Sequence, residues 1–155
     1  MAKKMALIAT KGTLDMAYPP FILGSTAAAL GWDVQIFFTF YGLQLLRKDL
    51  SAVKISPLGN PAMPMPVPMP VLVQILPGME SMATMMMKQK MKSKGVASLE
   101  QLRDLCLEAD VKFVACQMTV DLFEFQKSDF IDNIEYGGAA TFMKFAGESD
   151  VCLFI

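Results

Sequence analysis

Three cysteines supply most of the nucleophilic chemistry that this sequence can offer. They are Cys106, Cys116 and Cys152, and the chain of 155 residues contains no histidine. Without histidine, Ser–His and Cys–His catalytic pairs and histidine-containing zinc sites are excluded within the chain. None of the cysteines belongs to a CxxC pair, so no structural metal site is expected. The chemistry left to consider is that of a thiol acting without a histidine partner.

Cys116 has the sequence position that most favours a reactive thiol. It ends the apolar, β-branched run 112–116, which predicts a buried strand, and a short helical stretch is expected from about Thr119. Free N–H groups and the dipole at a helix N-terminus stabilise a thiolate and lower its pKa. The same position also suits a small, inert residue that caps a buried strand. Position alone leaves both interpretations open.

The other two cysteines are expected in the core. Cys106 shares a predicted helix face with Leu99, Leu102 and Ala109, which favours packing, with a role as resolving partner of Cys116 as the alternative. Cys152 lies inside the apolar run 151–155, which predicts a buried closing strand.

The elements that must position these thiols alternate along the chain. Apolar or β-branched runs predict strands at 5–10, 33–40, 112–116 and 151–155, and a fifth strand around 71–76. Helices are predicted at 14–30, 43–48, 79–94, 98–109 and 139–146, besides the stretch from 119. This alternation is typical of a single α/β domain, 1–155, with a mainly parallel sheet of four to five strands and helices on both faces.

The carboxyl ends of such strands share one edge of the sheet, where ligands bind. Lys11 and Gly12 follow the first predicted strand, and Gln117 and Thr119 follow Cys116. Lys11 would offer positive charge to an anionic sulfur species, Gly12 would allow close backbone approach, and backbone N–H groups of 117–119 would stabilise an adduct. For Lys11 the alternative is an ordinary solvated loop lysine, and the Lys-Gly-Thr sequence at 11–13 lacks the GxxxxGK[ST] pattern of a phosphate-binding loop.

Two segments depart from this alternation. Residues 51–77 hold seven of the nine prolines, which predicts an extended Pro/Met-rich insertion in which neither a helix nor a central strand fits, the strand around 71–76 being the alternative for its end. Helix 79–94 is amphipathic, with apolar positions 79, 82, 83, 86 and 87 and with lysines at 88, 90, 92 and 94. Its methionines favour packing between subunits, and docking on a membrane surface or in a partner's groove is the alternative. Copper binding is not favoured, because neither cysteine nor histidine supports the MxM spacings.

Composition excludes several classes of function. The formal net charge is −1, with 14 Lys plus Arg against 15 Asp plus Glu, so nucleic acid is not an expected partner. No run reaches the ~18 apolar residues of a membrane span. The apolar run from Met5 stops at Lys11, too early for an export signal. Together with the odd number of cysteines, this predicts a cytoplasmic location, with peripheral membrane contact as an option.

Four blocks of residues resemble the DsrE/DsrF-like family, in its branch often labelled peroxiredoxin-like. They are IATKGTLDMAYPP (8–20), FFTFYG (37–42), PLGNPAMPMPVP (57–68) and ACQMTVDLF (115–123). The resemblance implies a flavodoxin-like three-layer domain, a homo-oligomer of three or more subunits, TusA-like and rhodanese-like partners, and no cofactor. It also implies that Cys116 is the sulfur-carrying cysteine, because this residue matches the family's.

The expected function is therefore that of a sulfur carrier, with sulfurtransferase activity in the loose sense. Cys116 would accept sulfane sulfur as a persulfide or thiosulfonate and relay it to a TusA-like acceptor, a reaction that needs a thiolate but no histidine. The alternative is a non-catalytic subunit that docks on a membrane or partner through helix 79–94. A flavin- or nucleotide-binding module is a third option, suggested only by analogy of fold.

Overall fold

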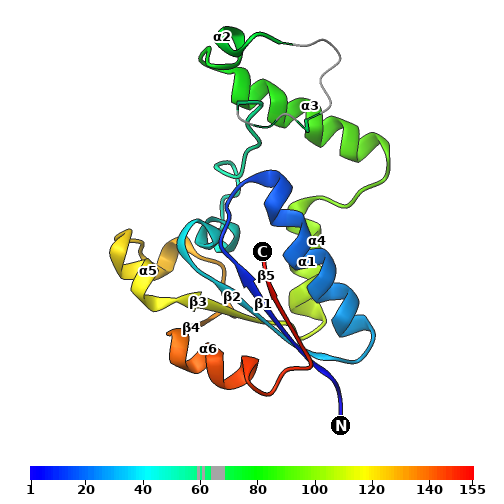
Figure 1. Cartoon of the computed structure of the whole chain (residues 1–155), viewed down its shortest axis with the longest axis vertical. Coiled ribbons are helices and arrows are strands. Elements are labelled where there is room, and N and C mark those ends of the chain that lie inside the picture. Colours follow the sequence, from blue (N-terminus) through cyan, green and yellow to red (C-terminus); the bar gives the residue numbers. More distant parts are fainter. Residues whose placement is uncertain (59, 61, 64–68) are drawn as a thin grey trace. The chain divides into compact units, whose positions relative to one another are not determined.

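A parallel sheet lies at the centre of the computed structural model, which describes residues 1–58, 60, 62–63 and 69–155. Within these residues the sheet has five strands, in the order β4-β3-β2-β1-β5, and every neighbouring pair is parallel (Figure 1). The strands are β1 (Lys4–Ala9), β2 (Asp33–Phe38), β3 (Lys112–Cys116), β4 (Glu135–Gly137) and β5 (Val151–Phe154). The strands expected near 5–10, 33–40, 112–116 and 151–155 are thus confirmed.

Helices cover both faces of this sheet. Helices α1 (Leu14–Ala29) and α4 (Leu99–Glu108) pack together on one face, where the ring of Phe21 lies 5.9 Å from that of Phe38. Helix α6 (Ala139–Ala146) covers the other face, where Phe142 stacks on Phe37 at 4.9 Å. Neighbouring residues of a strand point to opposite faces, so Phe37 and Phe38 pack on opposite sides of the sheet. The predicted three-layer α/β fold is confirmed.

The fifth strand is not where the sequence predicted it. Residues around 71–76 begin instead with helix α2 (Val71–Gln74), preceded by Pro70 at its N-cap. Proline is well tolerated at a helix start, and a short apolar run does not by itself distinguish strand from helix. The fifth strand is β4, whose three residues include a glycine and give no apolar run. The element expected at 43–48 is a 3₁₀ helix, η1 (Phe40–Leu46), and α5 (Gln117–Leu122) begins directly after Cys116.

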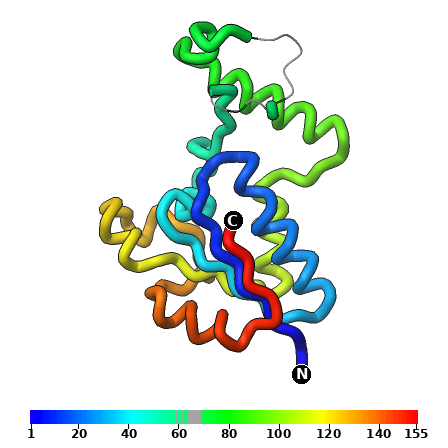
Figure 2. The backbone as a smooth tube through the Cα atoms, viewed as in Figure 1, coloured from blue at the N-terminus to red at the C-terminus, as the bar shows by residue number. Residues whose placement is uncertain are grey.

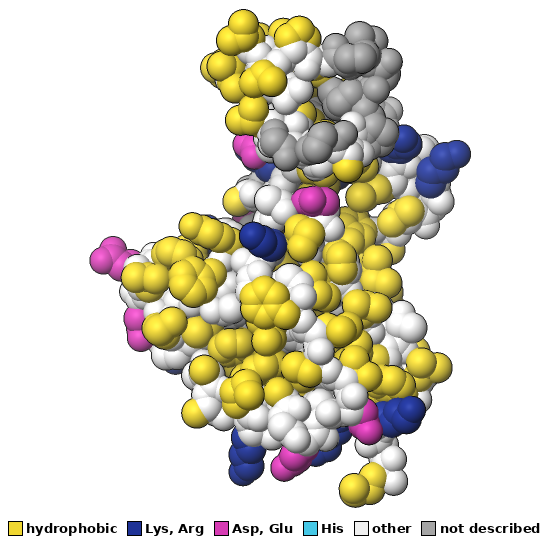
Figure 3. All heavy atoms as spheres, viewed as in Figure 1, with side chains coloured by type: hydrophobic (Ala, Val, Ile, Leu, Met, Phe, Trp, Pro, Cys, Tyr) yellow, Lys and Arg dark blue, Asp and Glu magenta, His cyan; other side chains and the backbone are white. Residues whose placement is uncertain are grey.

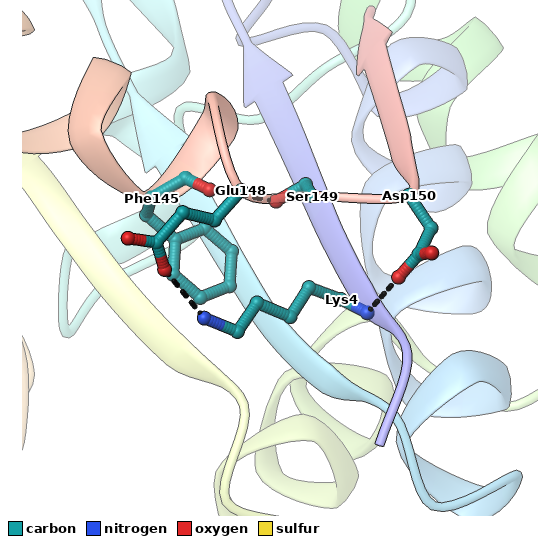
Figure 4. Close-up of polar contacts among 5 residues, drawn as sticks. All are labelled: Lys4, Phe145, Glu148, Ser149 and Asp150. Atoms are coloured by element: carbon teal, nitrogen blue, oxygen red, sulfur yellow. Dashed lines mark hydrogen bonds and ion pairs between the residues drawn. The ribbon is translucent and has the colours of Figure 1, made fainter. Parts of the chain in front are cut away.

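Strand β5 lies beside β1 at one edge of the sheet (Figure 2). At the start of these strands, Lys4 binds two acidic residues of the β5 approach (Figure 4). Its N–H donates to Asp150 at 2.8 Å, and its ammonium group lies 2.7 Å from Glu148. The prediction that Cys152 is buried is wrong, because this thiol is exposed and Phe154, two residues further along β5, is 74% exposed. An edge strand that α6 does not cover keeps an apolar sequence without being buried.

Residues 54–98 form a second compact unit, which contains most of the predicted 51–77 insertion. Its main element is α3 (Met79–Ser93), which begins after Gly78 in the left-handed conformation (φ 88°). The buried Thr84 hydroxyl of α3 bonds the backbone of Ile55, accepting from its N–H at 3.0 Å.

The presence of α2 contradicts the expectation of no helix in 51–77. Positions 59, 61 and 64–68 of the Pro/Met-rich stretch lie outside the described residues. In the part of the chain that is described, no helix has the length and apolar character needed to cross a membrane.

Candidate functional site

Cys116 is the last residue of β3 and the N-cap of α5. Its register partner in β4 is Gly137, and its side chain joins the apolar cluster of Phe37, Val114 and Phe142 under α6. Only 4% of the residue is exposed. The sulfur is therefore almost fully buried, at the carboxyl edge of an internal strand, where a helix begins.

The surroundings of the sulfur are polar as well as apolar. Burial by itself raises the pKa of the Cys116 thiol. Hydrogen bonds from the Thr119 hydroxyl and N–H, the Thr39 hydroxyl and the Met118 N–H outweigh it and lower the pKa below the ordinary value of a cysteine. These donors face the charged form, so the surroundings of Cys116 favour the nucleophilic thiolate.

The two threonines also contact each other. Their hydroxyl oxygens lie 3.2 Å apart, and the N–H of Phe40 donates to the Thr119 oxygen at 3.3 Å. Thr119 was predicted from the sequence, whereas Thr39 was missed. A signal for it was available, because Thr39 directly follows β2 as Cys116 ends β3, and Phe38 pairs with Ala115. Residues that follow paired positions of parallel strands stay neighbours at the sheet edge.

Close backbone packing holds this edge in place. A Cβ atom at Gly42 would lie 2.1 Å from the carbonyl oxygen of Ala9, and one at Gly12 would lie 2.5 Å from that of Tyr41. The loops after β1 and β2 can therefore approach only because both positions are glycine. Between them, Phe40 has a φ of 47°, a left-handed conformation that costs a residue with a side chain about 1–2 kcal/mol. Tertiary contacts impose this conformation on the residue next to Thr39.

The remaining predicted site residues have different surroundings. Lys11 is exposed in the loop between β1 and α1, and Gly12 of the same loop packs on the loop after β2. The amide of Gln117 donates to the carboxylate of Asp121 at 2.7 Å, so this side chain is engaged along α5. Of the backbone groups expected around the sulfur, the N–H groups of Met118 and Thr119 reach it. Thr119 is thus the predicted residue with the most direct contacts to Cys116.

Cys106 lies in the opposite layer of the protein. A Cβ at Gly24 would lie 3.7 Å from the Cys106 sulfur and 3.0 Å from Ile36, which places this thiol on the α1–α4 face. Cys116 lies on the α6 face, so the sheet separates the two thiols and a resolving role for Cys106 has no support. The fully buried Cys106 thiol donates to the Phe21 carbonyl at 3.2 Å. Burial raises its pKa to about 12, against weaker lowering by Ser25.

This raised pKa predicts an alkaline loss of stability. Above about pH 9 the unfolded state releases the Cys106 proton and the native state keeps it, so unfolding becomes easier by about 1.4 kcal/mol per pH unit up to the native pKa. The contribution is fully present below pH 9. We expect Cys106→Ser, which keeps a donor for Phe21 but does not titrate, to show a shallower fall of the unfolding free energy between pH 9 and 10.5. Urea titrations at several pH values measure this, and equal slopes for the two proteins would contradict the assignment.

No cluster of three or more His, Cys, Asp or Glu side chains that could hold a metal ion occurs among the described residues. The site consists of one thiol with hydroxyl and amide donors, which suits chemistry on sulfur itself.

The fold and this site define a class, that of α/β domains with one hydrogen-bonded thiol at the carboxyl end of an internal parallel strand. The model of the DsrE/DsrF/DrsH-like family matches residues 1–154, and the chain belongs to this family.

Two relatives and one solved structure extend this finding. The chain is 68% identical to a protein of Allochromatium vinosum named sulfur carrier protein DsrE2, over 99% of this chain and 98% of that protein. It is 34% identical to the uncharacterized protein YrkE of Bacillus subtilis, over 99% and 97% of the two chains. The crystal structure of the ychN protein from E. coli has a TM-score of 0.58 at 11% identity, over 99% of both chains. This last likeness concerns the fold alone.

Proposed function

We propose that this protein is a sulfur carrier that holds sulfane sulfur on Cys116 as a persulfide or thiosulfonate and relays it to a TusA-like acceptor. The observation that carries the proposal is the thiol at the end of β3, with four hydrogen-bond donors facing its charged form. The name of the Allochromatium vinosum relative, a sulfur carrier protein, supports the same role. A rhodanese-like protein or a thiosulfonate would be the donor.

The loading step needs only groups that the site contains. The Cys116 thiolate attacks the outer sulfur of a donor persulfide, R–S–SH; a new S–S bond forms, the donor's S–S bond breaks, and its electron pair leaves with the donor thiolate. No external oxidant and no histidine is required. Because 4% of Cys116 is exposed, a protein donor must meet the sulfur at the sheet edge, where Phe40 and Met118 are exposed. A local displacement there would open the path.

Intact-protein mass spectrometry tests the function. After exposure to polysulfide or thiosulfate, we expect sulfur-sized additions that a reductant removes. A loaded sample mixed with a purified TusA-like protein should lose the addition as the acceptor gains it. A wild-type protein that takes up no sulfur from either donor would refute the carrier role.

A second candidate function, docking on an anionic membrane, has support within the 54–98 unit. Apolar side chains are exposed around α2, with Leu72 76% exposed, and Figure 3 shows hydrophobic side chains gathered there. On α3 only Ala83 and Thr84 are buried, while three methionines of the helix stay exposed: Met82, Met85 and Met86. Four exposed lysines lie at the end of the same helix: Lys88, Lys90, Lys92 and Lys94. Exposed apolar residues beside lysines are the features of a helix that binds anionic lipid surfaces.

Vesicle flotation separates docking from sulfur transfer. We expect the protein to float with phosphatidylglycerol vesicles and to stay behind with phosphatidylcholine, since each lysine contributes about 1 kcal/mol at an anionic surface. Replacing the four α3 lysines by glutamine should reduce flotation at least about tenfold. An equal loss of charge at four lysines of the other unit, Lys3, Lys48, Lys112 and Lys144, is the matched control. Equal effects of the two sets, or no flotation at all, would refute the docking surface.

A further inference from the structure

We infer that Thr39 and Thr119 are positioning residues that hold the sulfur of Cys116 as a thiolate and stabilise it as the leaving group when the carried sulfur departs. The inference rests on the proposed sulfur-carrier function and adds a direction to it: the site is built to release sulfur as well as to take it up. Neither threonine touches the acceptor in this scheme. Both act through the cysteine.

Thr119 is fully buried and held by a backbone donor. The residue has an exposed fraction of 0%, so bulk water does not replace its partners. Its hydroxyl oxygen accepts a hydrogen bond from the N–H of Phe40 at 3.3 Å. An N–H group can only donate, and therefore this contact orients the Thr119 oxygen as an acceptor and leaves its proton free to donate elsewhere.

The protons of the two hydroxyls match a charged sulfur better than a neutral one. The hydroxyls carry two protons, and three contacts are available to them: Thr39 with Thr119 at 3.2 Å, and each hydroxyl with the Cys116 sulfur. A thiolate only accepts, so both protons can be used when the sulfur is charged, either directly or through the chain Thr39 to Thr119 to sulfur. A neutral thiol carries its own proton and is a weak acceptor, so it forms weaker hydrogen bonds with the two hydroxyls. The arrangement therefore discriminates in favour of the charged sulfur.

The backbone of the loop after β2 orients the hydroxyls of Thr39 and Thr119. Phe40 has the left-handed φ of 47°, which is unfavourable for an aromatic residue, and its N–H points at Thr119. The Ala9 carbonyl accepts from the N–H of Thr39 at 3.1 Å, which ties the start of this turn to β1. Such outliers persist only where surrounding contacts determine them, and they concentrate at functional sites. Here the turn brings a donor from the β2 loop onto the hydroxyl that faces the thiol of β3.

The chemical consequence concerns release. An acceptor thiolate attacks the outer sulfur of the Cys116 persulfide; its new S–S bond forms, the bond between the outer sulfur and Sγ breaks, and the electron pair goes to Sγ. The proton on the outer sulfur travels with it. The charge that develops on Sγ is the charge that the hydroxyls and the α5 N–H groups already face. A better stabilised thiolate leaves faster.

The test uses four variants in a Cys152→Ser background, which removes the exposed thiol. Thr119→Val and Thr39→Val delete one hydroxyl each at nearly constant volume, and Thr119→Ser and Thr39→Ser keep it. The readout is the pH profile of Cys116 alkylation by iodoacetamide, located by peptide mass spectrometry. We expect each valine variant to react about tenfold more slowly at pH 7 with its midpoint moved to higher pH, and each serine variant to stay within about twofold of the parent.

A second readout addresses release. Proteins loaded with sulfane sulfur are mixed with cyanide, and thiocyanate formation is followed over time. The valine variants should release sulfur more slowly by a factor similar to that in alkylation, and the serine variants should not. Unfolding curves confirm which variants are folded, and because the two threonines lie on different elements, one folded valine variant suffices.

The outcomes separate the role of the hydroxyls from the carrier function itself. Unchanged alkylation profiles in a folded valine variant, or serine variants as impaired as the valine ones, would overturn the role of the hydroxyls even if the protein loads sulfur normally. Shifted profiles in a protein that never loads sulfur would keep the hydroxyl role and refute the carrier function. Alkylation needs no sulfur donor, so the two measurements are independent.

Discussion

In a Cys152→Ser background, which removes the exposed thiol, Cys116→Ser is expected to abolish sulfur loading. The double variant should show none of the sulfur-sized mass additions that polysulfide or thiosulfate places on the Cys152→Ser parent. A serine hydroxyl is not ionised near neutral pH and is a poor nucleophile toward sulfur, whereas the hydrogen bonds of Thr119, Thr39 and Met118 favour the thiolate of Cys116. The change removes one buried sulfur and is small in volume, so we expect the fold to persist.

The matched controls for this prediction are the two other cysteines. Cys106→Ser should load normally, because that thiol is buried on the other face with a raised pKa. Cys152→Ser should keep the loading of Cys116 and lose only the slower addition of sulfur to the exposed Cys152 thiol. If Cys116→Ser takes up as much sulfur as the wild type and Cys152→Ser takes up none, the carrying residue is Cys152 and the proposed site is wrong.

Gly42→Ala is expected to cause the largest loss of stability among substitutions near the site. The added Cβ would lie 2.1 Å from the Ala9 carbonyl oxygen and 2.8 Å from its carbonyl carbon. Both atoms belong to the backbone of β1, which cannot rotate away as a side chain can. We expect a loss of at least about 3 kcal/mol in the free energy of unfolding, as for severe overpacking. Chemical denaturation measures it directly.

Gly138→Ala is the control for that experiment, since a Cβ there would have no neighbour within 4 Å and the backbone needs no positive φ. It should cost about 1 kcal/mol or less, because alanine is a poorer helix N-cap than glycine. The fraction of Gly42→Ala protein that stays folded should also react more slowly with iodoacetamide at Cys116. A displaced loop after β2 would move the Thr39 hydroxyl away from the Cys116 sulfur. Equal stability of the two alanine variants would show that the loops do not pack as closely as the structure indicates.

Local patterns predicted most of the sheet because its internal strands are buried on both faces. The runs near 5–10, 33–40 and 112–116 are apolar and β-branched, and each became a strand with bounds within two residues. The same rule was wrong for Cys152, since an edge strand can carry an apolar sequence and stay exposed. It also missed β4, whose residues Glu135, Tyr136 and Gly137 carry no strand pattern.

Only those residues of the candidate site that are close to Cys116 in the sequence were predictable. Cys116, Met118 and Thr119 lie within four residues, and the pattern of a strand followed by a helix start indicated them. Thr39 is separated from Thr119 by 80 residues, and only the parallel pairing of β2 with β3 brings their hydroxyls within 3.2 Å.

The amino-acid sequence by itself determined the chemistry available to this protein: one thiol at a strand end, no histidine, and enough apolar runs to build a parallel α/β sheet. The tertiary structure alone decided which groups face that thiol and which cysteines lie away from it. The physical reason is the separation along the chain over which each kind of interaction acts. Periodicity and helix-start signals act between residues a few positions apart, whereas the hydrogen bonds that favour a thiolate come from loops that meet only when the sheet is assembled.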